Sequence, residues 1–324
     1  MGPIAFLSHS LAEPSVQPTL LIKRCLRSRL NTNQCQRCVQ SCPASALNVI
    51  DHKISFDASS CTSCMSCVAV CPQDALVSDH DIKKLLGSLP ADKDIIISCI
   101  RQKQSCFDEI TLPCVGIVSK QLLAAFVLKG CKSITFQLSG CSECCNEDVS
   151  KTFRLICKQL LEELDDLHPS KVILSEKGEQ LTHHEMGRRS YLTKLQQLVV
   201  GASKKTFSIT SDHLDDGLKN SRRIPFKTEL IRKVITSLEG DAQTKVVRLF
   251  SHKVSLTKEC TCCPLCKGIC PTGAIKIERS GTGKWFNFEM LDCSGCGLCV
   301  EFCKNNAISL TPHCVLKPDF VSKT

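Results

Sequence analysis

Residues 259–275 read ECTCCPLCKGICPTGAI. This stretch contains a run of four cysteines followed by proline, and a second run with the same spacing follows 23 residues on; the two runs are Cys260, Cys263, Cys266 and Cys270, and Cys293, Cys296, Cys299 and Cys303. In such a pair the first three thiolates of a run bind one [4Fe-4S] cluster and the fourth reaches the other cluster. The spacing therefore predicts a two-cluster module at this end of the chain.

A second copy of the module lies near the N-terminus, with one position changed. One run is complete, at Cys61, Cys64, Cys67 and Cys71; the other has Cys35, Cys38 and Cys42, with Thr32 where a further cysteine is expected. A similar segment follows every run: CPASAL (42–47), CPQDAL (71–76), CPTGAI (270–275) and CKNNAI (303–308). Its small alanine predicts a short turn and then a strand packed against a cluster. Residues 46–57 and 274–289 alternate apolar and polar side chains and predict β-hairpins.

Both blocks resemble the bacterial dicluster ferredoxins, over residues 25–80 and 257–312. The resemblance implies four [4Fe-4S] clusters, with these ligands: Cys260, Cys263, Cys266 and Cys303; Cys293, Cys296, Cys299 and Cys270; Cys61, Cys64, Cys67 and Cys42; and an incomplete set of Cys35, Cys38 and Cys71. Structural zinc is the alternative, but it prefers separated C-x2-C pairs, into which these runs do not divide. Cys262 is then a spare thiol.

The incomplete set has one candidate for its fourth ligand. Cys25 lies ten residues before Cys35 and is the only cysteine upstream of it. A loop of this length closes at a modest entropic cost, so we expect Cys25 to reach the vacant iron. Arg24, Arg27 and Arg29 on the same segment are expected to offset cluster charge. The alternative is that Cys25 is a bystander, which leaves a [3Fe-4S] cluster or an exposed iron.

The middle of the chain is also rich in cysteine, with seven in residues 94–147. Apolar segments at 94–99, 132–141 and 170–176 predict strands, and the patterns of 112–131 and 148–164 predict helices, the first closed by Gly130. Strands that alternate with helices predict a small parallel α/β domain. Three of the cysteines, Cys99, Cys114 and Cys141, fall at predicted carboxyl ends of strands, where open α/β sheets bind ligands.

This segment is similar to the iron–sulfur delta subunit of methyl-viologen-reducing hydrogenases, a domain also fused to heterodisulfide reductase subunits. The resemblance rests on a strand ending in Cys99, a PC-x-G turn at Cys114 and a strand ending at Cys141. It implies a [2Fe-2S] cluster held by Cys99, Cys114, Cys141 and either Cys144 or Cys145, because the spacing in GCSECC departs from the family. Buried, inert thiols are the alternative, and we assign Cys131 and Cys157 to the core.

We therefore expect an α+β protein in which two ferredoxin-like dicluster domains flank a small α/β domain and a helical connector. The expected parts are a 1–24 extension, a 25–80 dicluster domain, an 81–180 α/β domain, a 181–256 connector and a 257–324 dicluster domain. Residues 187–258 hold 15 Lys and Arg against 6 Asp and Glu. They predict helices at 188–200 and 227–238, and their basic face is either solvated or a docking surface for an acidic partner.

Charge and hydropathy exclude several classes of protein. Four clusters of about −2 each offset the formal charge of +9, so this charge does not indicate nucleic-acid binding. No apolar run reaches the ~18 residues that span a bilayer. The 26 cysteines without a recognisable signal peptide indicate a cytoplasmic protein with reduced thiols.

Nothing in the sequence indicates a substrate site. It has no dinucleotide or phosphate loop, no nucleophile elbow and no spaced carboxylate pair. Clusters ligated only by thiolates carry electrons, so we expect an electron-transfer subunit of a larger anaerobic oxidoreductase. Its expected partners are hydrogenase, heterodisulfide-reductase-like or molybdopterin oxidoreductase subunits. The alternatives are an enzyme, or an iron or redox sensor, that uses the incompletely ligated cluster at Cys35, Cys38 and Cys71.

Overall fold

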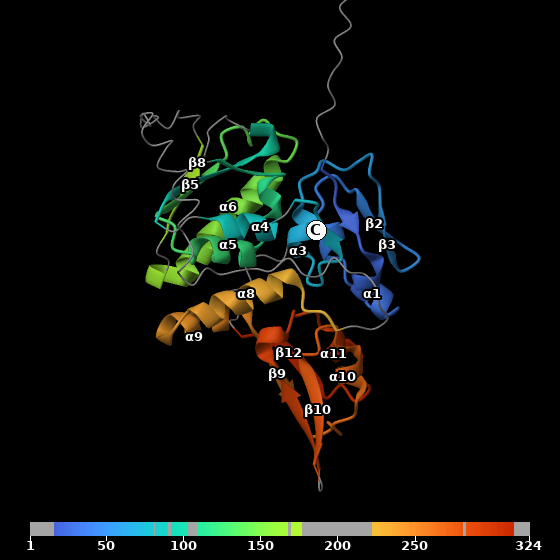
Figure 1. The fold of residues 1–324 in the computed structure, drawn as a ribbon. Helices are drawn as coiled ribbons and strands as arrows, with labels where there is room; N and C mark the ends of the chain where they lie inside the picture. The colour runs from blue at the N-terminus through green and yellow to red at the C-terminus, as the bar shows by residue number, and fades with distance from the viewer. Residues whose placement is uncertain are drawn as a thin grey trace, which may run out of the picture.

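The computed structural model describes residues 16–80, 82–89, 92–102, 109–167, 170–176, 222–280 and 283–313. Three parts follow one another along these residues (Figure 1). We call them the N-terminal unit (16–80), the sheet unit (82–176) and the C-terminal unit (252–313). A pair of helices, α8 (Phe226–Ser237) and α9 (Gly240–Phe250), joins the last two.

The N-terminal unit is built from two antiparallel strand pairs and short helices. Its elements are β1 (Thr19–Leu20), η1 (Ile22–Arg24), α1 (Leu26–Arg29), α2 (Arg37–Gln40), β2 (Leu47–Ile50), β3 (Lys53–Phe56), α3 (Ser66–Val70) and β4 (Leu76–Val77). The predicted hairpin is β2–β3, and β1 pairs with β4. Because β1 lies in the predicted 1–24 extension, the unit begins several residues before Cys25.

The C-terminal unit repeats this plan. Its elements are β9 (His252–Leu256), α10 (Leu265–Ile269), β10 (Ile275–Ser280), β11 (Gly283–Phe288), η5 (Met290–Asp292), α11 (Leu298–Glu301) and β12 (Ile308–Pro312). The predicted hairpin is β10–β11, and β9 pairs with β12. Since β9 lies within the predicted connector, this unit too starts before its expected boundary.

The sheet unit holds four parallel strands in the order β6-β5-β7-β8. Its elements are α4 (Ile82–Ser88), β5 (Asp94–Cys99), η2 (Ile100–Gln102), β6 (Glu109–Leu112), η3 (Val115–Ile117), α5 (Lys120–Val127), β7 (Ser133–Gln137), α6 (Glu147–Leu164), η4 (Asp165–Leu167) and β8 (Lys171–Ser175). The three predicted strands and both predicted helices are present. The sequence did not predict β6, because its four residues are too short to show a pattern of their own.

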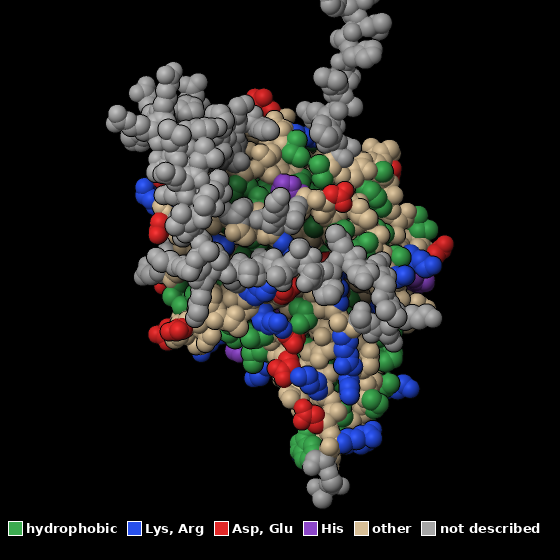
Figure 2. All heavy atoms as spheres, in the orientation of Figure 1, with side chains coloured by type: hydrophobic (Ala, Val, Ile, Leu, Met, Phe, Trp, Pro, Cys, Tyr) green, Lys and Arg blue, Asp and Glu red, His purple; other side chains and the backbone are tan. Residues whose placement is uncertain are grey.

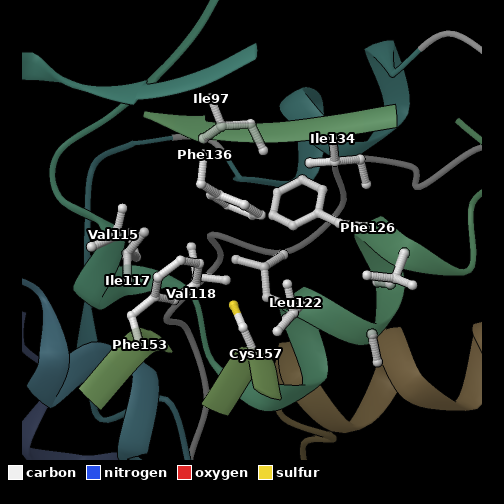
Figure 3. Close-up of a cluster of buried hydrophobic side chains, with 14 of the residues drawn as sticks. Ile97, Val115, Ile117, Val118, Leu122, Phe126, Ile134, Phe136, Phe153 and Cys157 are labelled. Atoms are coloured by element: carbon white, nitrogen blue, oxygen red, sulfur yellow. The ribbon is translucent and has the colours of Figure 1, made fainter. Parts of the chain in front are cut away.

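An apolar core lies between this sheet and its helices (Figure 3). Phe136 on β7 meets the rings of Phe126 on α5 and Phe153 on α6 edge-on, with centroids 6.5 and 4.8 Å apart. The Cys157 side chain lies among these residues (Figure 3), and both Cys131 and Cys157 are fully buried. Their assignment to the core is confirmed.

The helix predicted at 227–238 is α8, and it is not simply solvated. Its residues Leu230, Ile231, Val234 and Ile235 are buried, and they join the core of the sheet unit. Apolar side chains at these spacings form one face of a helix, which explains the burial. The helix predicted at 188–200 lies outside the described residues.

Candidate metal centres

The segment after each cysteine run folds in the same way in all four places. The third residue after the last cysteine has a positive φ, and the alanine that follows is buried; the four pairs are Ser45 (φ 51°) and Ala46, Asp74 (47°) and Ala75, Gly273 (77°) and Ala274, and Asn306 (49°) and Ala307. This left-handed residue aims the next backbone N–H back at the cysteine. In three places the alanine N–H donates to the cysteine Sγ: Ala46 to Cys42 at 3.3 Å, Ala75 to Cys71 at 3.2 Å and Ala307 to Cys303 at 3.3 Å.

The fourth turn reaches the same result through a side chain. The Ala274 N–H donates to Thr272 Oγ1 at 3.3 Å, and this hydroxyl lies 3.5 Å from Cys270 Sγ. N–H···S and O–H···S bonds favour a thiolate and tune the potential of a cluster it binds. In all four places, the segment that ends in alanine therefore puts a hydrogen-bonding group beside the sulfur of a predicted ligand.

In the C-terminal unit, one predicted ligand set surrounds a cavity. Cys260, Cys263, Cys266 and Cys303 all line a cavity of about 200 Å³, together with Leu256 and Phe286. Cys260 and Cys263 lie in the loop before α10, Cys266 lies on α10, and Cys303 follows α11. The donors and the space fit one cubane.

The second set of this unit is deeper. Burial raises the pKa of Cys299 to about 12, with further contributions from the nearby Cys296, Cys293 and Cys270. Burial also raises the pKa of Cys293 to about 12, partly opposed by the Gly295 N–H. All four predicted ligands are thus close neighbours. Thiols that are buried close together are difficult to deprotonate by themselves. A metal core that binds them favours the thiolate form.

In the N-terminal unit, the complete run forms an equally close group. Burial raises the pKa of Cys67 to about 12, and the next causes are the charges of Cys64 and Cys42. Cys61 has the same two neighbours. The structure therefore brings together the four predicted ligands Cys42, Cys61, Cys64 and Cys67.

The incomplete set is joined by the predicted substitute. Cys25, Cys35, Cys38 and Cys71 line one small cavity of about 20 Å³. Cys25 is 9% exposed, whereas Thr32, at the vacant position of the run, is exposed to solvent. Burial is the main cause that raises the pKa of Cys38 to about 12, and the nearby charges of Cys71, Cys35 and Cys25 raise it further. The loop 25–35 thus brings Cys25 beside the three predicted ligands Cys35, Cys38 and Cys71.

A buried cation lies beside this cavity. Arg27 is 3% exposed, and its Nε donates to the Cys35 carbonyl oxygen at 2.6 Å. It makes no ion pair with any residue that the structure describes. A buried, unpaired guanidinium costs several kcal/mol. An anionic cluster bound by the adjacent thiolates would supply a counter-charge, so Arg27 fits the predicted group.

We expect the substitution Arg27→Gln to lower the midpoint potential of one cluster and leave the others unchanged. Loss of a buried positive charge disfavours the reduced form of the nearby cluster, because that form carries more negative charge than the oxidised form. EPR-monitored redox titration measures this shift. Arg29→Gln on the same helix is the matched control, because Arg29 is only half-buried. Equal potentials in the wild type and in Arg27→Gln would show that Arg27 does not act on a cluster.

The sheet unit contains a cysteine-lined cavity that is larger than the two described above. A cavity of about 280 Å³ is lined by Cys99, Cys114, Cys141, Cys144 and Cys145. Cys99 is the last residue of β5, and Cys114 and Cys141 follow the adjacent strands β6 and β7, at the carboxyl edge of the sheet. Arg101 Nη1 lies 2.8 Å from Cys145 Sγ and 3.8 Å from Cys144 Sγ. Since Cys145 is exposed and Cys144 lies near Cys99 and Cys141, the geometry favours Cys144 as the fourth donor.

The sites are packed against one another. Cys64 is among the charges that raise the pKa of Cys114, after burial and Cys99, so the sheet-unit cavity adjoins the N-terminal unit. A Cβ on Gly116 would overlap the Cys64 carbonyl oxygen, which explains the glycine two residues after Cys114. Within the N-terminal unit, Cys38 lies near Cys67 and connects the two sets.

The N- and C-terminal units also meet at their cysteine loops. Gln73 Nε2 donates to Ser294 Oγ at 2.5 Å, and Arg37 Nη2 donates to the Gly295 carbonyl oxygen at 3.4 Å. Asn33 Nδ2 lies 2.8 and 2.9 Å from the two carboxylate oxygens of Glu301. Each residue is within two positions of a predicted ligand. The junction therefore places the Cys25 set beside the set of Cys270, Cys293, Cys296 and Cys299.

Helix α8 fastens this junction. Lys227 Nζ lies 3.0 Å from Asp74 Oδ1, and the Phe226 N–H donates to Asp74 Oδ2 at 2.5 Å. Both side chains of the ion pair are nearly buried, at 12% and 10% exposure. Asp74 also supplies the left-handed turn before Ala75, so one residue serves both the cysteine turn and the interface. Nothing local in the sequence indicated this contact, because its partners are about 150 positions apart.

Among the described residues, no three His, Cys, Asp or Glu side chains converge closely enough to hold a single bare metal ion. The cysteines instead line cavities. No helix in that part of the chain is long and apolar enough to cross a bilayer.

Two family models match the ends of the chain. Residues 24–80 match a 4Fe-4S dicluster domain, and residues 287–309 match a 4Fe-4S binding domain. No solved structure matches. The protein therefore carries ferredoxin-type [4Fe-4S] domains near both ends, as predicted. The resemblance of the middle segment to the hydrogenase delta subunit stays a prediction.

Several oxidoreductase subunits are similar to part of the chain. Pyruvate synthase subunit PorD of Thermotoga maritima is 38% identical over 69 residues, which cover 21% of this chain and 63% of the relative. NADH-quinone oxidoreductase subunit I 2 of Geobacter metallireducens is 36% identical over 70 residues, 19% of this chain and 53% of the relative. A subunit of the ion-translocating oxidoreductase complex of Methanosarcina acetivorans is 43% identical over 42 residues, 13% of this chain and 16% of the relative. The chain thus spans little more than half the length of the first two.

Proposed function

We propose that this iron–sulfur, ferredoxin-like electron-transfer protein is a relay of five centres, four [4Fe-4S] clusters and one [2Fe-2S] cluster. The observation that carries the proposal is the unbroken succession of cysteine sets. It runs from the sheet-unit cavity through Cys114 and Cys64, then Cys67 and Cys38, then the Gln73–Ser294 junction, and then the C-terminal pair of sets.

The proposed ligands follow that order. They are Cys99, Cys114, Cys141 and Cys144 for the [2Fe-2S] cluster; Cys42, Cys61, Cys64 and Cys67; Cys25, Cys35, Cys38 and Cys71; Cys270, Cys293, Cys296 and Cys299; and Cys260, Cys263, Cys266 and Cys303. In each dicluster unit a short helix carries thiols of both sets, as Cys266 and Cys270 do on and just after α10. This linkage fixes the spacing of neighbouring clusters.

The bound clusters supply one-electron chemistry at low potential. The protein holds them with thiolates, donates N–H and O–H groups to the sulfurs, and places Arg27 as a counter-charge. Full thiolate ligation leaves no iron open to a substrate. Cys25 lines the same cavity as Cys35, Cys38 and Cys71, and this supports a relay over the enzyme and sensor alternatives.

A relay needs a donor and an acceptor, so we place this chain in a larger oxidoreductase complex. The relatives described above carry the names of oxidoreductase subunits, which supports a partner of that class. Hydrogenase, heterodisulfide-reductase-like or molybdopterin enzyme subunits in the cytoplasm fit the resemblance of the sheet unit.

The proposal predicts how the reduced protein behaves in EPR. Anaerobically reconstituted protein should show only low-potential cluster signals on stepwise reduction, and small-molecule substrates should leave them unchanged. The reason is that fully ligated clusters have no site at which a substrate can bind. A signal that shifts when a substrate is added would contradict the relay and favour catalysis at an open iron.

A further inference from the structure

The cluster set of Cys260, Cys263, Cys266 and Cys303 lies closest to the surface. All four of its cysteines are half-exposed, whereas every other proposed set includes at least one buried cysteine. If the relay proposed above holds, this set is the end at which a partner exchanges electrons.

The surroundings are rich in unpaired cations. Lys304 lines the cavity, Lys258 precedes Cys260 by two residues, Lys267 follows Cys266, and Lys284 acts electrostatically on Cys262. None of them forms an ion pair with a residue that the structure describes. Glu259 is the one acidic residue within this stretch of the rim, from Lys258 to Lys267. Figure 2 shows Lys and Arg side chains, with Asp and Glu side chains among them, over the part of the molecule that carries the C-terminal unit.

The neighbouring hairpin adds a pair of like charges. Arg279 on β10 lies directly opposite Lys284 on β11. Like charges at facing positions of antiparallel strands destabilise the pair. Together with Lys258, Lys267 and Lys304 they outnumber Glu259, Glu278 and the charge of about −2 that a bound cluster adds. The face therefore keeps a small positive excess when one cluster is bound, and an acidic partner would relieve the repulsion between Arg279 and Lys284.

The centre of this face is apolar. Leu256 is 41% exposed and lines the cavity beside Phe286. An apolar centre within a charged rim is the usual composition of a transient protein interface. We infer that this face, defined by Leu256, Lys258, Lys267, Arg279, Lys284 and Lys304, is the docking surface for an acidic one-electron carrier protein.

The test uses the full chain, anaerobically reconstituted and reduced, mixed in a stopped-flow instrument with an oxidised acidic flavodoxin. We expect the second-order rate constant to fall at least tenfold from low to high salt, since charge complementarity acts mainly on encounter. The triple variant Lys258→Glu, Lys284→Glu, Lys304→Glu should lose about tenfold at low salt and match the wild type at high salt. A basic cytochrome c should react faster with this variant than with the wild type.

The matched control is Lys53→Glu, Lys93→Glu, Lys171→Glu, which changes net charge equally on the other two units. It should retain at least half the wild-type rate. The comparison holds for variants whose cluster EPR signals remain intact. An equal loss of rate in both triple variants, or no loss of rate in the first, would contradict the docking surface. Absence of reducible clusters from every protein contradicts the relay itself. If the first triple variant loses binding to anionic vesicles but keeps its flavodoxin rate, the face binds lipid and the inference is wrong.

Discussion

Replacing Cys25 by serine is expected to remove the fourth ligand of one cluster. The variant should lose about one iron per chain if the site becomes [3Fe-4S], or about four if the cluster is lost, and an oxidised-state [3Fe-4S] EPR signal marks the first case. The reason is geometric, because Cys25 lines the cavity with Cys35, Cys38 and Cys71 and no other described cysteine does so. Iron analysis and EPR of the anaerobically reconstituted protein measure the change.

The control for this experiment is Cys262→Ser. Cys262 lies between two proposed ligands in the C-terminal unit and is half-exposed, yet the register gives it no ligand role. Its replacement should leave the iron content at the wild-type value. Unchanged iron and EPR in Cys25→Ser would show that Cys25 is a bystander and that the site has an open iron.

The second large effect is expected from Asp74→Asn. This change keeps a residue that tolerates a positive φ and an acceptor for the Phe226 N–H, but it leaves Lys227 buried without a counter-charge. Breaking a buried ion pair from one side costs about 3–5 kcal/mol. For a chain of this size, we expect the melting temperature of the anaerobic, cluster-loaded protein to fall by at least about 6 °C.

A second variant separates the ion pair from other effects. Asp74→Asn with Lys227→Met removes both charges and should recover most of the lost stability, because replacing a buried pair by apolar groups is often neutral. A single variant as stable as the wild type would mean that α8 does not fasten the junction. A double variant no better than the single one would place the role of Asp74 in its turn instead.

The ligand sets could be predicted from the sequence because their spacing is local. Two or three residues between cysteines fix how a short loop can wrap a cluster, and the alanine segments repeat that geometry. The loop from Cys25 to Cys35 is also short, so its closure could be anticipated. Arg27 was expected as a counter-charge with two neighbours, but only the fold shows that it is the buried one.

The contacts that join the sites could not be predicted in this way. Gln73 and Ser294 are 221 positions apart, and Asn33 and Glu301 are 268 apart. Such pairs depend on how whole units pack, which a single sequence does not encode in any local pattern. Thr32 first suggests a damaged site. Its neighbour Asn33 is almost fully buried and binds Glu301, so the altered loop now forms part of the junction.

A count of iron and acid-labile sulfide per chain tests whether this protein holds five iron–sulfur centres. After anaerobic reconstitution of the protein, four [4Fe-4S] clusters and one [2Fe-2S] cluster give about 18 irons and about 18 sulfides. About 16 irons and 16 sulfides would mean that the sheet unit holds no cluster. Iron-free protein that retains zinc would contradict every iron–sulfur centre assigned to this chain.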